Sequence, residues 1–485
     1  MRFVAMVWQV WLVSRIGEPG IGLFQLVMSV AGLSATVAVS GSRFTATRLV
    51  SEELGLDRPG GAAKALSVCT LYGLFFGLLA GSGLLLLARP IGFLWLEDAR
   101  TVRPLMLLAL EMPLTGLDAV MHGYFTAVGR VWKGVCISLL HQLTAIAVTA
   151  YLLSAIPAGD LEAACRGITA GRLLAAGLEC AVTAVVYADD RIRHSITGNA
   201  CTDSSLDMVR RALTLALPLA AAGYARSGLS TLQHLLVPVG LRASGLGAEA
   251  ALSGYGVIQG MVLPAVLFPS CVMTAAAELI VPELTRRQVR NGGEDIRASA
   301  GRIMGLGTRY AFLCAAVCFS LGDCLGTVLF RSPEAGRYIR LFALLIPVMY
   351  LDTLADGCLK GLGQMMFCMY VNIADAGLSA LMIWLLLPRF GLPAYIFTIF
   401  FTEGFNFLLS LWRLRRISGF RIPGKDLLLS TGTAVLSAGA GWPVSKSTSA
   451  GNGIPALVIS VLVSLAAYAL LSLRPGAAAG RPASW

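Results

Sequence analysis

Long apolar segments recur along this chain, and many of them are long enough to cross a membrane. Of its 485 residues, 56% are hydrophobic and only 13% are charged, with a mean hydropathy of +0.74. About a quarter of the residues of a typical soluble domain are charged. The runs are interrupted by Gly and Pro, as membrane helices often are, and they lack the alternation of barrel strands. The sequence therefore predicts an all-α integral membrane protein.

One stretch of the chain, residues 113–129, occurs twice. A shift of 234 positions places Pro113, Leu117, Asp118, Gly123 and Gly129 over Pro347, Leu351, Asp352, Gly357 and Gly363. Ten of the forty positions from 91 to 130 are identical under this shift. A duplicated unit is the simplest explanation, so we expect two copies of one helical bundle.

The apolar runs predict six helices in each copy, since a spanning helix needs about 20 residues. In the first copy we expect helices at 3–14, 22–41, 65–88, 104–128, 134–155 and 161–187. In the second copy we expect them at 212–239, 254–281, 301–330, 339–362, 365–387 and 394–411. Two further helices, 427–441 and 455–473, lie outside the duplication and precede a tail expected to be disordered. The predicted fold is thus two six-helix lobes, 1–200 and 205–420, with two extra helices in 421–485, or about fourteen helices.

Two parts of the first copy depart from this plan. The run 3–14 covers only about 20 Å of a membrane core about 30 Å thick, so the first helix is expected to be truncated, as by a start codon placed too late. The polar stretch 43–58 is expected to form a loop. Because each copy has an even number of helices, both should point the same way, related by a pseudo-twofold axis along the membrane normal.

The distribution of charge gives an orientation. The net charge is +11. If the N-terminus is cytoplasmic, the loops on the cytoplasmic side contain more Lys and Arg than the loops on the outer side. We expect both termini to be cytoplasmic, and no nucleic-acid partner. The eleven cysteines are scattered without metal-ligand spacing, and Walker A, GxSxG and HExxH motifs are missing. The sequence predicts no enzyme activity, no cofactor and no metal site.

Three motifs resemble those of the stage V sporulation protein B family: GEPGIGLFQ at 17–25, TRLVSEE at 47–53 and YARSGLS at 224–230. This family belongs to the superfamily of multidrug, oligosaccharidyl-lipid and polysaccharide exporters, alongside the MurJ lipid II flippases. The resemblance implies two lobes around a central cavity, alternating access and a place in the bacterial plasma membrane. It implies that the partners are an undecaprenyl-diphosphate-linked sugar lipid, which is the cargo, and the surrounding membrane lipids. The short first helix departs from this pattern, since the first helix of MurJ-like flippases lines the cavity.

Arg226 is the strongest candidate for contact with such a cargo. A charged side chain at bilayer depth costs about 2.5–3.5 kcal/mol on insertion scales, so it needs a reason to be there. Arginine binds phosphate through two donors, and Gly223, Ser227 and Gly228 leave room beside it. The alternative is an interhelical bond to a carbonyl or carboxylate. Arg15 and Arg48 are further cavity candidates, although anchoring at the membrane interface is the favoured explanation for each.

Further polar residues lie within the apolar runs. Gln25 and Gln259 occupy equivalent places in the copies and either face the cavity or join helices. Asp118 and Asp352 are coupling-ion candidates, or they bond to backbone freed by Pro113 and Pro347. Glu111 is a further residue with either a coupling or a structural role. The residues expected to pair with one another inside the first lobe are Glu111, His122, Arg166, Arg172 and Glu179. His234 and Asp375 are expected to make satisfied contacts.

Three functions compete. The first is a flippase for a lipid-linked oligosaccharide, such as a lipid II-type peptidoglycan precursor, in spore cortex or wall polysaccharide synthesis. The second is a multidrug or cation antiporter of the same superfamily, which needs a carboxylate near its cation. The third is a membrane scaffold that recruits wall-synthesis enzymes without transport, which the short first helix favours.

Overall fold

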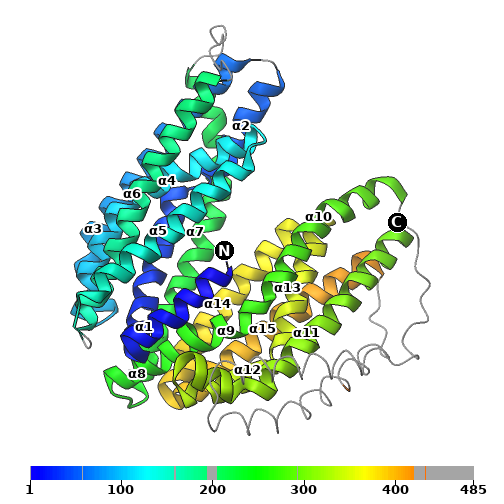
Figure 1. Ribbon diagram of the computed structural model, residues 1–485. Coiled ribbons are helices and arrows are strands. Elements are labelled where there is room, and N and C mark those ends of the chain that lie inside the picture. Colours follow the sequence, from blue (N-terminus) through cyan, green and yellow to red (C-terminus); the bar gives the residue numbers. More distant parts are fainter. Residues whose placement is uncertain are drawn as a thin grey trace. The chain divides into compact units, whose positions relative to one another are not determined.

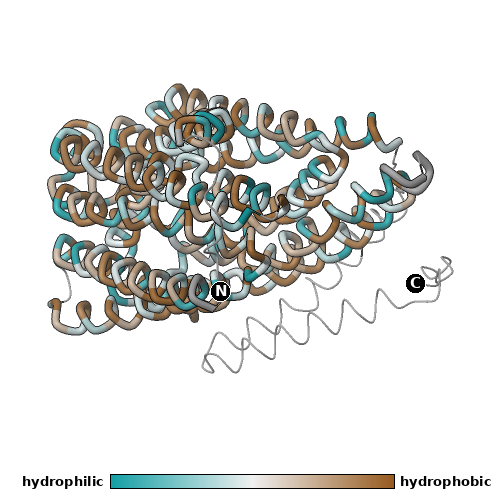
Figure 2. The backbone as a smooth tube through the Cα atoms, turned by 90° about the horizontal axis from the view of Figure 1, so that it is seen from above, coloured by the Kyte–Doolittle hydropathy of each residue, from teal (hydrophilic) through white to brown (hydrophobic). Residues whose placement is uncertain are grey.

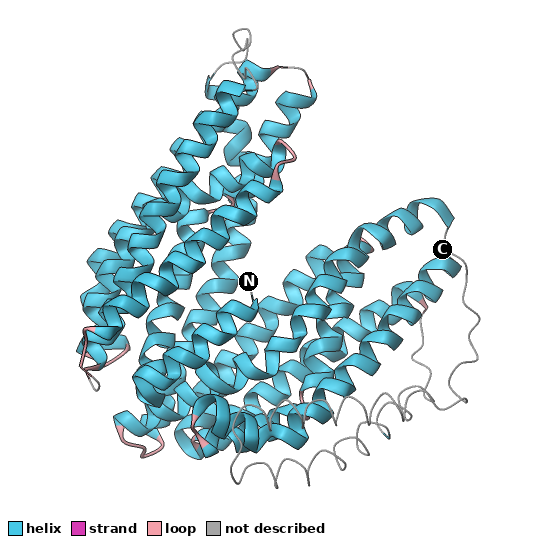
Figure 3. Cartoon of the chain, in the orientation of Figure 1, coloured by secondary structure: helices cyan, strands magenta, loops and turns pink. Residues whose placement is uncertain are grey.

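The computed structural model describes residues 2–419, apart from 57, 158–159, 194–204 and 292, together with Gly432. All regular elements of this described part are helices, as Figure 3 shows. Nine helical stretches in it, or ten with one bent pair, are long and apolar enough to cross a membrane. Apolar residues run along most of them in Figure 2. The predicted all-α membrane fold is confirmed, whereas the helices expected at 427–441 and 455–473 and the tail lie outside the described residues.

The chain packs into two compact units. The N-terminal unit is Leu23–Ala248, and the C-terminal unit combines Met1–Gly22 with Glu249–Trp485. The expected division into 1–200, 205–420 and 421–485 follows the duplication, and as a statement about the repeat it stays a prediction. Packing divides the chain elsewhere, because residues 205–248 pack with the N-terminal unit and the first 22 residues pack with the C-terminal one.

The N-terminal unit is a bundle in which α4 packs against α2, α3 and α6, and α5 packs on α6 (Figure 1). Its elements are the second half of α1 (Arg2–Val39), α2 (Ser42–Gly55), α3 (Pro59–Pro90), η1 (Ile91–Trp95), η2 (Ala99–Thr101), α4 (Val102–Ala127), α5 (Val131–Ser154), α6 (Leu161–Arg193) and α7 (Ser205–Ala243). The loop expected at 43–58 was wrong, since most of it is α2. Ala46, Leu49 and Val50 recur at helical spacing and are buried in the core with α3 and α4, which explains the helix.

In the C-terminal unit, α13 packs against α10, α11 and α15, and α14 packs on α15. Its elements are α8 (Ala248–Gly256), η3 (Val257–Val262), α9 (Leu263–Leu267), η4 (Phe268–Ser270), α10 (Cys271–Asn291), α11 (Gly293–Phe330), α12 (Pro333–Ala343), α13 (Ile346–Gly361), α14 (Met365–Phe390) and α15 (Leu392–Ser418). The helix expected at 254–281 lies within one continuous helical span, Ala248–Gln288, whose helix type changes along α8, η3, α9, η4 and α10. The helix expected at 339–362 is bent by 56° between α12 and α13. Pro347 begins α13, where its missing N–H costs nothing.

The expected helices 3–14 and 22–41 join across Gly17 as α1. Gly17 has φ 70°, a conformation that glycine adopts readily, and it separates two helical segments. Beyond this break, the Glu18 carboxylate accepts hydrogen bonds from Ser253 at 2.8 Å and Ser332 at 2.6 Å. Gln9 donates to the carbonyl of Gly260 at 2.8 Å. These bonds tie the first half of α1 to the C-terminal unit.

The duplication is visible in the local packing of each unit. A Cβ atom on Gly123 would lie 2.5 Å from the carbonyl oxygen of Arg43, and one on Gly357 would lie 2.7 Å from Cβ of Ala277. Positions 43 and 277 are themselves related by the shift of 234. Gly129 and Gly363 end their helices with φ of 75° and 74°. The two copies therefore bring the same pairs of helices into close contact.

Candidate functional site

Two networks of buried and half-buried polar side chains lie at corresponding places in the two units, each built on one duplicated aspartate. The N-terminal network consists of Glu111, Asp118 and His122 on α4, Ser138 and His141 on α5, and Arg172 and Glu179 on α6. The C-terminal network consists of Asp352 and Asp356 on α13, Asp375 on α14, and Glu403, Asn406 and Ser410 on α15. Ionisable groups inside a membrane segment are costly, so both networks are candidates for function.

The N-terminal network is joined by close contacts between three helices. Arg172 donates to Glu111 at 2.8 Å, and Nδ1 of His141 lies 2.8 Å from a carboxylate oxygen of Glu179. Nε2 of His122 lies 3.5 Å from Oδ2 of Asp118 and 3.2 Å from Oγ of Ser138. The expected pairing of polar residues inside the first copy is confirmed for Glu111 and Arg172.

The C-terminal network is dominated by acids. The carboxylate of Asp352 is repelled electrostatically by Asp356, Asp375 and Glu403. The nearest compensation is on Asp356, which lies 3.5 Å from both Lys360 Nζ and Ser410 Oγ. Oδ1 of Asp352 and Oδ1 of Asp375 are buried and have no hydrogen-bond partner in the described chain. The satisfied contact expected for Asp375 was therefore wrong for this oxygen.

The two networks correspond position by position. Adding 234 to Asp118, His122 and His141 gives Asp352, Asp356 and Asp375. Histidines in the first copy thus stand where carboxylates stand in the second. Sequence reasoning missed His141, Asp356 and Glu403 as members. The same shift that identified the aspartates would have found the first two, whereas Glu403 has Thr169 at its shifted position.

The backbone-bonding role considered for Asp118 and Asp352 receives no support from their contacts. In the described residues neither carboxylate accepts a hydrogen bond from the backbone, and Oδ1 of each lacks any partner. Asp118 and Asp352 instead face the other members of their networks. This arrangement is compatible with holding a cation or a proton.

Arg226 lies on the exposed side of α7 in the N-terminal unit. Neighbouring polar residues of α7 hold that helix against α1: Ser227 contacts Thr36 at 3.1 Å, and Tyr224 contacts Ser40 at 2.5 Å. Within the part of the chain that the structure describes, no hydrogen bond or ion pair is recorded for Arg226. The YARSGLS motif therefore combines helix-packing residues with one exposed guanidinium.

The other cavity candidates are divided between the units. In the N-terminal unit, Arg48 pairs with Glu52 at 2.8 Å, one turn further along α2, and Gln25 is half-buried on α1. In the C-terminal unit, Arg15 is exposed on α1, and Gln259 donates to the Tyr395 hydroxyl at 2.5 Å. The contact of Gln259 joins η3 to α15, which is the helix-joining alternative considered for it.

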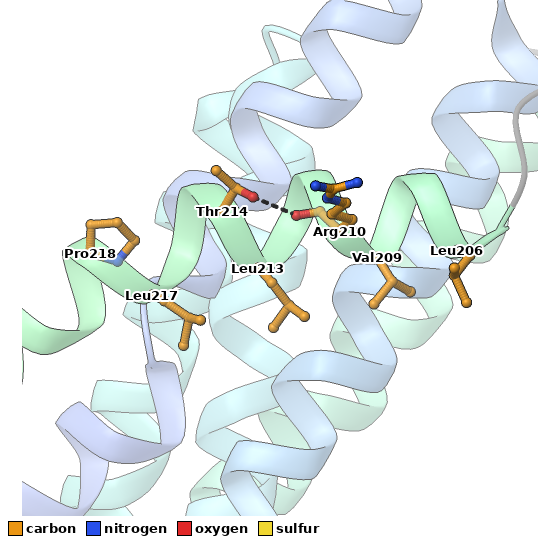
Figure 4. Close-up of a pocket in the computed structure, with 7 residues that line it drawn as sticks. All are labelled: Leu206, Val209, Arg210, Leu213, Thr214, Leu217 and Pro218. Atoms are coloured by element: carbon orange, nitrogen blue, oxygen red, sulfur yellow. Dashed lines mark hydrogen bonds between the residues drawn. The ribbon is translucent and has the colours of Figure 1, made fainter.

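A cavity of about 590 Å³ lies along the first half of α7. Figure 4 shows Leu206, Val209, Leu213 and Leu217 projecting from one side of this helix, with Arg210 and Thr214 above them. The hydroxyl of Thr214 donates to the carbonyl of Arg210 at 2.8 Å and is thereby satisfied within the helix. The cavity is thus mainly apolar, with one basic side chain at its edge.

Comparison with known proteins identifies relatives in sequence. The model of the MatE family matches residues 239–385. Stage V sporulation protein B of Bacillus subtilis is 20% identical over 395 residues, which cover 80% of this chain and 75% of that protein. Sporulation protein YkvU of the same organism is 22% identical over 171 residues, 34% of this chain and 38% of that protein.

Solved structures share the fold. The lipid II flippase MurJ in an inward closed conformation superposes with a TM-score of 0.70 at 12% identity, covering 97% of this chain and 96% of that one. An inward-facing multidrug resistance MATE transporter of the MOP superfamily gives 0.63 at 12% identity, covering 86% and 95%. A MOP superfamily transporter from Pyrococcus furiosus, described as having a binding pocket of reverse polarity, gives 0.57 at 12% identity over 86% and 92%. The resemblance drawn from the three motifs is confirmed, and the fold is that of this superfamily.

Proposed function

Because the chain is a homologue of stage V sporulation protein B with the fold of MOP superfamily transporters, we propose that it is a flippase for a lipid-linked oligosaccharide. It works by alternating access in the bacterial plasma membrane, with both termini in the cytoplasm. The cargo is an undecaprenyl-diphosphate-linked sugar lipid of the lipid II type, used for spore cortex or wall polysaccharide. The protein moves this lipid between leaflets without breaking a covalent bond.

The exposed Arg226 is the observation that carries this proposal. It lies on a helix with no acidic residue from 212 to 239, and no partner for it is recorded in the described chain. Placing an unpaired guanidinium on a membrane helix is unfavourable unless something neutralises it. A diphosphate would neutralise it effectively, because the planar guanidinium donates two parallel hydrogen bonds to phosphate oxygens.

The apolar cavity on the same helix supports a lipid cargo. Leu206, Leu213 and Leu217 offer an aliphatic surface to a polyprenyl chain, and Arg210 supplies a cation at its edge (Figure 4). A lipid-linked sugar needs both features, since its head group is anionic and its tail stays in the bilayer. A soluble drug would not require the apolar face.

Flipping of fluorescent lipid II in proteoliposomes tests this proposal. We expect Arg226→Ala to abolish most of the flipping and Arg226→Lys to retain part of it, because lysine keeps the charge and loses the paired geometry. Arg389→Ala removes an exposed arginine at the end of α14 and serves as the control with unchanged flipping. Each variant is checked for insertion and for its melting temperature.

Two results would contradict the proposal. Normal flipping by Arg226→Ala would remove the assigned contact, and absence of flipping by the unmodified protein would favour the scaffold for wall-synthesis enzymes. A scaffold would bind such enzymes in pull-down experiments independently of Arg226.

The C-terminal network supports a second candidate, an exporter of organic cations. Asp352 lies near three other carboxylates there, and Lys360 pairs with one of them, Asp356. An intramembrane carboxylate near its cation is what such an antiporter requires. The test is efflux of ethidium from the same liposomes. Efflux that depends on Asp352 and not on Arg226 would favour the antiporter over the flippase.

A further inference from the structure

The N-terminal network contains a set of donors suited to a metal ion. Asp118, His122 and Glu179 each offer one oxygen or nitrogen atom, and these three atoms lie within 4.8 Å of one another. We propose that these side chains bind a divalent transition-metal ion, for which Zn²⁺ fits best. The site joins α4 to α6, and it is separate from the anion contact proposed at Arg226.

The geometry is close to that of a coordinated ion. Ligands about 2.0–2.2 Å from zinc in a tetrahedron lie about 3.4 Å from each other. Asp118 Oδ2 and His122 Nε2 are already 3.5 Å apart, because residues four apart share one face of a helix. Glu179 reaches the pair from α6, within 4.8 Å of both ligand atoms, and the three side chains would form a site that leaves one position open.

The chemistry of the donors favours a transition metal in this copy. Imidazole suits zinc and similar ions, whereas sites made only of carboxylates, carbonyls and water suit harder cations. At the positions of Asp118 and His122, the second copy has Asp352 and Asp356. The same shift places Arg413 at the position of Glu179, so only the first copy has a donor set that matches zinc.

Charge balance also favours an ion at this place. No Lys or Arg in the described chain forms an ion pair with Asp118 or Glu179, and Oδ1 of Asp118 is buried without a partner. The basic groups that pair with these carboxylates in the described residues are the imidazoles of His122 and His141, so a divalent ion would lower the cost of two carboxylates in a membrane helix bundle.

The surrounding residues hold the donors in place. Nδ1 of His141 lies 2.8 Å from Glu179, the kind of outer-shell contact that orients a ligand carboxylate. The imidazole of His122 fits against Gly134 of α5, where an added Cβ would lie 2.8 Å from Nδ1. Gly134 therefore leaves space for the His122 ring, whose Nε2 faces Asp118.

Metal titration of the purified full chain tests the site. The protein carries a tag without histidine, is stripped with a chelator in detergent, and is titrated with Co²⁺ and then Zn²⁺. We expect one Co²⁺ per chain, with the intense visible absorption of tetrahedral cobalt, and its displacement by Zn²⁺. His122→Asn should weaken zinc binding at least tenfold. Zinc should raise the melting temperature of the unmodified protein and not that of the variant.

Two matched variants distinguish this site from other binding. His234→Asn removes a histidine of α7 outside the network, and Asp352→Asn changes the equivalent position of the second copy. Both should bind zinc like the unmodified protein. Absence of stoichiometric metal in the unmodified protein would overturn the proposal. So would retention of zinc by His122→Asn, or its loss in Asp352→Asn, which would place the metal in the C-terminal network.

Discussion

Single carboxylates in this chain differ sharply in how their charge is stabilised. Asp190 is fully buried at the end of α6, where it accepts from Lys133 at 2.6 Å, from the Tyr124 hydroxyl at 3.1 Å and from Arg130. Asp375 is half-buried, and its buried Oδ1 has no hydrogen-bond partner in the described residues. The first arrangement stabilises the fold, and the second is the kind found where a cation or proton binds.

Asp190→Asn should destabilise the N-terminal unit. The substitution leaves Arg130 and Lys133 without their shared carboxylate, and breaking a buried ion pair costs about 3 kcal/mol. We expect the melting temperature in detergent to fall by several degrees. Asp207→Asn, which changes an exposed acid in the first turn of α7, should leave it within about a degree. Equal melting temperatures for the two variants would contradict this role of Asp190.

For single residues, the sequence indicated which polar side chains matter better than it indicated which residues they contact. The pairing of Glu111 with Arg172 could be expected, because unpaired charges are costly in a membrane. Glu403 could not be placed, since its partners Asp352 and Asp375 lie on other helices and at no fixed spacing from it. Contacts among α4, α5 and α6 depend on how these helices rotate against each other, and that rotation is not written in the apolar pattern.

Helix elements are joined at glycines that allow close approach. Gly123 faces the backbone of Arg43 between α4 and α2, and Gly357 faces Ala277 between α13 and α10.

Most helices could be predicted from their apolar runs. The helix α2 could not, because its mean polarity resembles that of a loop and only Ala46, Leu49 and Val50 mark its buried face. The bend before α13 was also missed, although Pro347 marks it.

Alanine at either of these two glycines should force its helix pair apart. The new Cβ would lie 2.5 Å from a backbone oxygen at position 123 and 2.7 Å from another Cβ at position 357, and such overpacking costs about 1–3 kcal/mol. Gly177→Ala in α6, where a Cβ meets nothing within 4 Å, should be neutral or slightly stabilising. Denaturation of the three variants compares these effects. A stable Gly123→Ala protein would show that α2 and α4 can separate freely.

The whole molecule reflects both the duplication and a partial exchange between its copies. Residues 205–248 pack in the N-terminal unit, and the first 22 residues pack in the C-terminal unit. The sequence could predict the duplication from Asp118, Asp352 and the shared glycines. It could not predict this exchange, because the repeat reflects ancestry whereas packing depends on contacts between side chains. Examples are the contacts of Glu18 with Ser253 and of Ser227 with Thr36.

At the scale of the whole transporter, the charge of the cargo predicts a response to membrane potential. An inside-negative potential drives an anion outward by about 2.3 kcal/mol per charge per 100 mV. The proposed diphosphate cargo should therefore accumulate in the outer leaflet of proteoliposomes when valinomycin and a potassium gradient make the interior negative. Reversal of the gradient should move it back. The orientation of the protein in the vesicle does not affect this equilibrium, so a mixed population suffices.

The same measurement separates the two candidate cargoes. Export of an organic cation would be opposed by the inside-negative potential, so the response of ethidium should have the opposite sign to that of lipid II. A leaflet distribution of lipid II that ignores the potential while flipping is fast would contradict the prediction, because a cation would then travel with the diphosphate. In that case the carboxylates of the C-terminal network are the residues to neutralise, and Asp352→Asn should restore the dependence on potential.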